Sequence, residues 1–342
     1  MHTERLRELA EISAYAGGRA DYTQGGGGNT SVKLQGGLMA IKASGFRLCD
    51  MTETEGYVTV RYRDVAAYYA GVDTSQDKDF EKESADAAKN SVSLLPGMRE
   101  GLRPSVEVGF HSVLSNYVIH THSVYANLLA CALKGEQLAA EAFADADFKF
   151  IWMPYINPGF TLTLRIMERL RAFETAPEVI FMQNHGVIVH ADTPARAMEL
   201  HERVNALIKE YFRIPEGDFS EITLKQTAEN VFESQTATVL SFVKHAPLGL
   251  EQLDAVPLYP DQLVYLNSTL RNTPGKMEVS HGKVTYFAGE KEARTLDETL
   301  AAYLYVVGTL NRLNLEISVM SQKETDFINN WEAEKYRRTL AK

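Results

Sequence analysis

The stretch Tyr117-Val118-Ile119-His120-Thr121-His122 reads as a β-strand whose end carries two histidines separated by one residue. Side chains alternate between the two faces of a strand, so His120 and His122 point the same way and can share one metal ion. Ser123 follows directly and can cap a helix that begins at Val124. The alternative is a plain strand end, with one histidine bonded to the backbone. Histidine is the commonest metal ligand, and the rest of the chain favours the metal site.

Composition excludes several classes of protein. The chain has 342 residues, enough for one large domain or two, and its 45% hydrophobic and 23% charged residues are ordinary for a globular protein. The formal net charge is -10, so no overall basic surplus favours a nucleic-acid partner. The cysteines Cys49 and Cys131 are too few for a disulfide scaffold or a cysteine-rich zinc site, and they fit a reducing cytoplasm. No signal-peptide pattern and no apolar stretch of bilayer length is present, so no membrane partner is expected.

A run of four glycines at 25–28 precedes Asn29 and a predicted strand over 31–34. Glycines let a backbone approach a ligand closely and turn its amides towards it. A nucleotide-binding Walker loop would instead lead into a helix through Gly-Lys-Ser/Thr, which is absent here. The alternative is a flexible hairpin loop.

Two further small polar segments can bind an anion. A predicted strand over 38–43 ends at Ser44-Gly45, and Ser105 opens a predicted helix that reaches about Asn116. The Ser105 hydroxyl can cap that helix or meet an anion at its positive end. Together with the glycine run, these segments offer amides and hydroxyls to a phosphate, from Gly28, Asn29, Ser44, Gly45 and Ser105.

Two more residues can join the paired histidines. His185 lies in the turn Asn184-His185-Gly186 between two apolar runs, where a side chain can be aimed into a cleft. Glu107 lies one turn before His111 on the predicted helix, although an acid in a first turn commonly just complements the helix dipole. Three histidines with an open or carboxylate-filled fourth position make a tetrahedral zinc site. Zinc can polarise a carbonyl or stabilise an enediolate, and a carboxylate beside it can take the proton from the neighbouring carbon.

The remaining pattern predicts two regions joined near residues 213–217. The first, 1–217, is predicted to contain helices over 1–18, 161–173 and from 194 onwards, an exposed helix or loop over 74–90, and strands over 57–62, 148–153, 179–182 and 187–189. The second, 218–342, is predicted to contain helices over 224–243, 296–313 and 323–339 and strands over 262–266, 276–279 and 283–287. His190 and His201 fit surface positions at least as well as ligand positions.

Five short motifs occur in a fixed order along the chain. They are Gly-Gly-Asn-Thr-Ser (27–31), Ala-Ser-Gly (43–45), Pro-Ser-x-Glu-x-x-x-His (104–111), His-x-His (120–122) and Asn-His-Gly-Val (184–187). In this order they resemble the class II aldolase/adducin family over roughly residues 3 to 212. Members of that family include fuculose-phosphate and rhamnulose-phosphate aldolases, ribulose-phosphate 4-epimerase, and related sugar-phosphate decarboxylases and dehydratases.

The resemblance implies an α/β fold, a three-layer α/β/α sandwich around a mostly antiparallel sheet, usually assembled as a homotetramer. It implies one zinc ion per chain on His120, His122 and His185, although another divalent transition metal would also fit. Glu107 would be both the fourth ligand of the resting site and the base that moves the proton. Phosphate binding would fall to Gly28, Asn29, Ser44, Gly45 and Ser105. The implied activity is that of a lyase that cleaves or forms a carbon–carbon bond beside the carbonyl of a ketose phosphate.

Departures from the family pattern keep alternatives open. Aldolases often carry a second serine where this chain has Val106, and the epimerase branch carries Asp where it has Glu107. Decarboxylation, dehydration and 4-epimerisation are alternatives on the same metal site, and a non-catalytic adducin-like module is a further one. None of the 16 tyrosines can be chosen as a proton donor.

Residues 218–342 loosely resemble the C-terminal region of long rhamnulose-phosphate aldolase/alcohol dehydrogenase proteins, without a dinucleotide-binding loop. They are expected to cover the cleft or build an oligomer interface.

Overall fold

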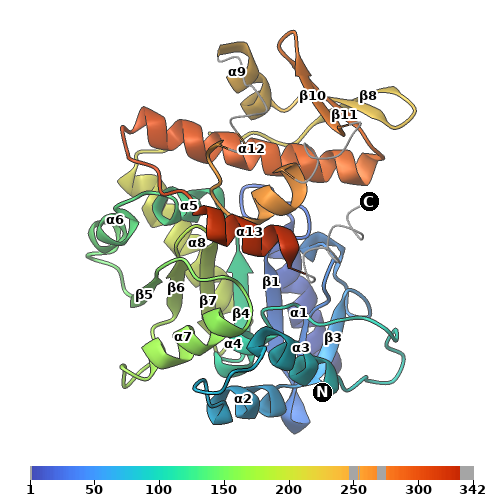
Figure 1. Ribbon diagram of the computed structural model, residues 1–342, viewed down its shortest axis with the longest axis vertical. Coiled ribbons are helices and arrows are strands. Elements are labelled where there is room, and N and C mark those ends of the chain that lie inside the picture. The colour runs from blue at the N-terminus through green and yellow to red at the C-terminus, as the bar shows by residue number, and fades with distance from the viewer. Residues whose placement is uncertain (1, 246–252, 254, 268–274, 332–342) are drawn as a thin grey trace.

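Figure 1 shows the computed structural model of the chain, in which residues 2–245, 253, 255–267 and 275–331 are described. A seven-stranded sheet lies between two layers of helices, and a smaller four-stranded sheet stands beyond the long helix α12 (Glu290–Arg312). The predicted three-layer α/β/α sandwich with a smaller C-terminal α+β region is therefore confirmed.

The large sheet is mostly antiparallel. Its strands are β1 (Asn29–Lys33), β2 (Leu38–Lys42), β3 (Tyr57–Arg61), β4 (Tyr117–Thr121), β5 (Phe150–Met153), β6 (Val179–Met182) and β7 (Gly186–Ala191). They follow the order β3-β2-β1-β4-β7-β6-β5, and only the β5–β6 pair is parallel. In the centre, His120 of β4 lies opposite Asn29 of β1 and Ile188 of β7. The end of β4 therefore meets both the glycine run before β1 and the turn between β6 and β7.

Helices cover both faces of this sheet. The first layer is formed by α1 (His2–Gly17), α5 (Val124–Ala130), α6 (Gly135–Ala142) and α8 (Pro194–Tyr211), and the second by α2 (Tyr62–Gly71), α3 (Phe80–Asn90), α4 (Val108–Val113) and α7 (Phe160–Leu170). Side chains of β4 alternate between the apolar cores on the two faces of the sheet. Ile119 packs against the first helix layer and Val118 against the second. His120 shares the face of Val118, so it points towards α4 and α7.

The C-terminal region packs onto the first helix layer. Its elements are β8 (Leu224–Ala228), β9 (Val231–Ser234), α9 (Ala237–His245), the π-helical turn η3 (Gln262–Asn267), β10 (Met277–Ser280), β11 (Lys283–Phe287), α12 and α13 (Gln322–Asn330). Its sheet is antiparallel in the order β10-β11-β9-β8. Leu300 and Leu304 of α12 belong to the same apolar core as Leu128 of α5. Burial of this shared apolar surface joins the two regions.

Two predictions for the C-terminal region are wrong. The predicted helix over 224–243 is a hairpin, β8 and β9, followed by the shorter helix α9, because Asn230 adopts a left-handed conformation (φ 54°) and Phe232 pairs with Tyr286 of β11. The predicted strand over 262–266 is the π-helical turn η3. A short apolar run that is buried on every side has no period to distinguish a strand from a helix. The predicted helix over 323–339 is α13 as far as Asn330; residues 332–339 lie outside the described part of the chain.

The helix predicted over 105–116 is also shorter than expected. α4 runs only from Val108 to Val113, and its N-cap position is occupied by Glu107 rather than Ser105. The chain turns to an extended conformation at Leu114 so that it can enter β4. Glu107 is therefore a residue at the helix entrance, free to point into the space beside β4.

His190 and His201 are buried, and the surface positions expected for them are wrong. His201 forms hydrogen bonds with the hydroxyls of Thr121 (2.7 Å) and Tyr15 (3.1 Å). His190 forms one with the Ser115 hydroxyl and donates another from Nε2 to the Pro177 carbonyl. His190 lies on β7 itself and His201 lies on α8, and both rings are buried with their polar atoms satisfied. Neither belongs to the histidine cluster described below.

His201 gives the stability of the fold a pH dependence. Burial, helped by the Arg19 charge, lowers the pKa of His201 to about 3, whereas an unfolded histidine titrates near 6.5. Below about pH 6.5 the unfolded chain takes up a proton that the folded chain does not, so stability is complete above that pH and falls towards pH 3. In urea unfolding, the free energy of unfolding should fall between pH 7 and 5 in both proteins. The fall should be smaller in His201→Gln than in the parent, by up to about 1.4 kcal/mol per pH unit. An identical pH slope in both proteins would contradict this.

Among the described residues, no helix has the length and apolar character required to cross a membrane.

Candidate metal centre

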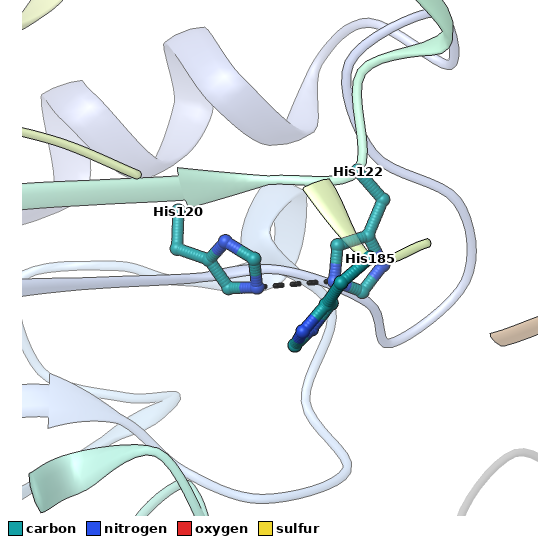
Figure 2. Close-up of side chains that lie close together, drawn as sticks. All are labelled: His120, His122 and His185. Carbon is teal, nitrogen blue, oxygen red and sulfur yellow. Dashed lines mark hydrogen bonds between the residues drawn. The ribbon is translucent and has the colours of Figure 1, made fainter. Parts of the chain in front are cut away.

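Figure 2 shows three histidine side chains pointing into one space beside the end of β4. His120 is the penultimate residue of β4 and His122 follows the strand directly. Thr121, between them, points to the opposite face, where it contacts His201. Ser123 then caps α5 by accepting a hydrogen bond from the backbone N–H of Ala126, as predicted. Strand alternation and the immediate start of α5 together fix the two rings on the same side.

The third ring comes from the turn between β6 and β7. Asn184 adopts a left-handed conformation there (φ 51°), and its side-chain amide donates to the backbone carbonyls of Leu258 (2.8 Å) and Ser318 (2.9 Å). At Gly186 an added Cβ would lie 2.3 Å from the Thr121 carbonyl oxygen, so only glycine lets β7 approach β4 this closely. These constraints carry His185 to the paired histidines.

The three rings are arranged as ligands of one ion. Their centroids lie 4.8 to 5.2 Å apart, and a donor atom from each lies within 4.8 Å of the others. His120 donates from Nδ1 to the Val187 carbonyl (3.0 Å), which leaves its Nε2 with a lone pair. The Nε2 atoms of His120 and His122 lie 3.1 Å apart. Two nitrogens bound to one tetrahedral zinc ion, each about 2.0–2.1 Å from it, would be about 3.3 Å apart, so the residues present fit a metal.

Glu107 completes this arrangement. Its Oε2 lies 3.4 Å from Nε2 of His120 and its Oε1 lies 3.4 Å from Nε2 of His185, and the residue is only 5% exposed. Oε1 has no hydrogen-bond partner among the described residues, although it is buried. A buried carboxylate oxygen aimed at histidine lone pairs is stable only with a proton or a cation between them. This is the second observation that fits a metal.

The charge states of these groups suit metal binding. Burial lowers the pKa of His120 to about 4 and the pKa of His185 to about 3, against the opposing charge of Glu107. Burial acts to raise the pKa of Glu107, but the facing rings of His120 and His185 and the amide of Asn29 outweigh it and lower that pKa. At neutral pH the site therefore offers neutral imidazoles and an ionised carboxylate, which are the forms that bind metals.

Asn29 connects Glu107 to the neighbouring residues. Its amide nitrogen donates to Oε2 of Glu107 (2.6 Å) and to Oγ of Ser105 (3.1 Å), and its amide oxygen contacts Nε2 of His111. The other ring nitrogen of His111 bonds to Ser31 on β1 (2.7 Å). His111 therefore orients Asn29 and does not face the metal space. His111 lies four residues after Glu107, and from there it holds the asparagine that bonds to the Glu107 carboxylate.

A pocket lined in part by His122 and His185 adjoins the histidine cluster. All the residues predicted to bind phosphate line it, namely Gly28, Asn29, Ser44, Gly45 and Ser105. The backbone N–H of Ser44 donates to the Arg103 carbonyl (2.8 Å) and that of Ser105 to the Lys42 carbonyl (3.2 Å), which holds the two serines side by side. The structure thus brings together every residue singled out from the sequence, and their binding roles stay predictions.

Lys42 is a member of the pocket that sequence reasoning missed. It is 3% exposed, and its ammonium group donates to the carbonyls of Gly26 and Phe46, both at 2.8 Å. The lysine therefore brings a positive charge to the floor of the pocket beside the glycine run. A lysine within the apolar strand β2, two residues before Ser44, was the available signal.

The C-terminal region also reaches the site. Pro260 and Asp261 line the pocket, and Oδ2 of Asp261 lies 2.6 Å from Nδ1 of His122. Glu298 of α12 accepts a hydrogen bond from the backbone N–H of Gly25 (2.9 Å) and pairs with Arg47 (2.6 Å). Sequence reasoning found no site residue in 218–342, because no motif marks these carboxylates.

The curated protein named uncharacterized oxidoreductase YuxG, from Bacillus subtilis (strain 168), is 28% identical over 199 residues, which cover 55% of this chain and 27% of that protein. The chain thus spans about a quarter of the length of the curated relative that it matches.

The chain also resembles solved structures over about three fifths of its length. The N-terminal class II aldolase domain of a conserved protein from Thermoplasma acidophilum is 25% identical, with a TM-score of 0.49 over 60% of this chain and 92% of that one. L-fuculose 1-phosphate aldolase is 21% identical, with a TM-score of 0.41 over 61% of this chain and 84% of that one.

A match to a family model shows to which protein family this chain belongs. The model for the class II aldolase and adducin N-terminal domain matches residues 7–212, which is more than half of the chain. That range contains the three histidines, Glu107 and the polar loops of the pocket. On this match, the chain belongs to the class II aldolase and adducin family.

Proposed function

We propose that this protein is a zinc-dependent aldolase, a lyase that cleaves or forms the carbon–carbon bond next to the carbonyl of a ketose phosphate. The observation that carries the proposal is the convergence of three histidine rings and the Glu107 carboxylate at the edge of a polar pocket. Membership of the class II aldolase and adducin family supports it. Zinc suits three neutral imidazoles and a carboxylate, although another divalent transition metal would also fit these donors.

In this proposal His120, His122 and His185 hold the metal, with Glu107 as the fourth ligand of the resting site. A bound divalent cation supplies a Lewis acid to the ketose carbonyl. In the direction of bond formation Glu107 takes the proton from the carbon next to that carbonyl, that carbon bonds to the aldehyde carbon, and the aldehyde oxygen takes up a proton to become a hydroxyl. Cleavage reverses these changes, and Glu107 then returns its proton to the carbon. Asn29 orients the carboxylate through its 2.6 Å hydrogen bond. The burial of the site keeps water from competing for the proton.

The adjoining pocket is proposed to bind the phosphate. Ser44 and Ser105 offer hydroxyls to it, and Lys42 places a positive charge beside it. Gly28, Asn29 and Gly45 complete the polar lining. The chain has a formal net charge of -10, so the binding of an anion depends on this local concentration of donors.

The test combines metal analysis with an activity panel. Purified protein should contain about one divalent metal ion per chain, and a coupled assay over ketose phosphates should detect retro-aldol cleavage of at least one of them. The same panel, extended to sugar-acid phosphates, separates cleavage from decarboxylation, dehydration and 4-epimerisation. Absence of metal and of every one of these activities would instead indicate a non-catalytic, adducin-like module.

Ser44→Ala should weaken substrate binding more than turnover. The loss of one hydrogen bond to a charged group is worth about 1.5–3 kcal/mol, so KM for the phosphorylated substrate should rise about 10- to 100-fold with a small change in kcat. Steady-state kinetics measure both constants. Ser91→Ala, another buried serine whose hydroxyl donates to the Ala88 carbonyl, is the control and should leave KM unchanged. An unchanged KM in Ser44→Ala would show that the phosphate binds elsewhere.

Two further parts of the proposal concern organisation. We propose that 1–217 is the catalytic unit, since the family match ends at residue 212, and that 218–342 covers its pocket. We also propose a homotetramer, which family membership supports, in the cytoplasm, which the free cysteines Cys49 and Cys131 fit. Light scattering of the purified protein measures the assembly.

A further inference from the structure

Asp261 is a buried carboxylate that the proposed chemistry does not use. It lies at the start of the helical turn that continues as η3 and is 0% exposed. Its Oδ2 lies 2.6 Å from Nδ1 of His122, and the ring of His122 is almost as deeply buried. Burying an ionised carboxylate is expensive unless a charged or strongly polarised donor faces it. The contact with His122 meets that need.

This contact decides which nitrogen of His122 carries the proton. An ionised carboxylate only accepts hydrogen bonds, so Nδ1 of His122 must be the protonated nitrogen. Nε2 of His122 then keeps its lone pair and points at the space shared with His120 and His185, 3.1 Å from Nε2 of His120. His120 obtains the same orientation from a neutral backbone carbonyl. Among the described residues of the cluster, His122 has a carboxylate at its Nδ1 where His120 has a backbone carbonyl, and this makes Nε2 of His122 the more basic of the two.

The surrounding residues hold Asp261 in place. The next residue, Gln262, donates from its side chain to the Leu253 carbonyl (2.7 Å) and accepts from the backbone N–H of Leu258 (2.7 Å), which fixes the turn. On the other side, a Cβ added to Gly27 would lie 2.1 Å from Oδ2 of Asp261 and 2.9 Å from Nδ1 of His122. Gly27 thus leaves open the space in which the carboxylate meets the ring.

We propose that Asp261 is a positioning residue of the metal site, which fixes the tautomer of His122 and strengthens its bond to the metal. This inference rests on the proposed metal-dependent function. Because Asp261 lies outside residues 7–212, the C-terminal region contributes directly to the metal affinity of the family domain. Residues 218–342 are then a working part of the site and not an independent module.

The experiment compares Asp261→Asn with Asp297→Asn in the full chain. Asp297 is an equally buried carboxylate of the same region, but it contacts Thr236 and Tyr286 away from the histidines. Zinc affinity is measured by competition with a chromophoric chelator, after circular dichroism has shown that each variant is folded. Asp261→Asn should weaken zinc binding about 10- to 100-fold, whereas Asp297→Asn should leave the affinity of the folded protein unchanged. Equal affinities in Asp261→Asn and the parent would overturn the proposal.

A second measurement needs no variant and so does not depend on Asp261→Asn folding. In nitrogen-15 NMR spectra of the zinc-loaded parent protein, His122 should show a protonated Nδ1 and a metal-bound Nε2. A protonated Nε2, or a His122 that does not sense zinc, would overturn the proposal.

The role of Asp261 and the proposed function are distinguished by metal binding in the parent protein. If the parent protein binds zinc and cleaves a ketose phosphate while Asp261→Asn keeps full affinity, the role of Asp261 is wrong and the proposed function stands. If the parent binds no divalent metal, both are wrong.

Discussion

His122→Ala is expected to remove the tightly bound metal and, with it, the lyase activity. Structural zinc sites with four protein ligands bind with about 10–16 kcal/mol, so one ligand contributes about 2.5–4 kcal/mol, and its loss should lower metal affinity about 70- to 900-fold. The variant also leaves Asp261 buried without its 2.6 Å partner, which adds a loss of stability. Metal content after dialysis and the rate of retro-aldol cleavage are the two measurements.

The control for this variant is His190→Ala. His190 is buried to a similar degree and makes two hydrogen bonds, but it lies outside the histidine cluster. It should lose stability and keep its metal. His120→Ala and His185→Ala should resemble His122→Ala, since all three rings face the same space. Full metal content in any of these three variants would remove that residue from the ligand set.

Glu107→Gln should retain most of the metal and lose most of the turnover. Glutamine has almost the same shape and can still accept the hydrogen bond from Asn29, but it cannot accept a proton from carbon. General-base catalysis typically contributes 10²–10⁴-fold, so kcat should fall by about that factor while the three histidines still hold the ion. Steady-state kinetics on metal-loaded protein measure the change.

Glu81→Gln is a suitable comparison for Glu107→Gln. Glu81 is a partly buried carboxylate that accepts a hydrogen bond from the backbone N–H of Phe160 at the start of α7. Its replacement should affect stability and leave kcat unchanged. If Glu107→Gln turned over every active ketose phosphate at the parental rate, Glu107 would not be the base.

The convergence of the three histidines could be predicted because much of their geometry is local. Two histidines separated by one residue at the end of a strand must share a face, and Ser123 directly after them marks the start of α5. Asn184-His185-Gly186 is a turn by composition alone, since asparagine and glycine accept left-handed conformations. These predictions depend only on neighbouring residues and not on contacts with distant parts of the chain.

The contribution of Asp261 could not be predicted in this way. It lies 139 residues from His122 along the chain, and no motif connects the two. The available signal in the sequence was an acidic residue, Asp261, directly before the apolar run 262–266. That run is buried in the structure. The hairpin of β8 and β9 was missed for a similar reason, because β9 pairs with residues of β11 that lie 52 to 56 positions further along the chain, and local propensity does not record such a pairing.

The Asn184 side chain has a consequence for how the protein is made. Its amide bonds to Leu258 and Ser318 lie 74 and 134 residues further along the chain. As a ribosome releases the polypeptide from its N-terminus, the first strands and helices can form early, whereas the turn that carries His185 gains its last anchor only when Ser318 has emerged. Loading of the ion should therefore be one of the final events of synthesis, and a chain interrupted before that point would expose an unfinished pocket.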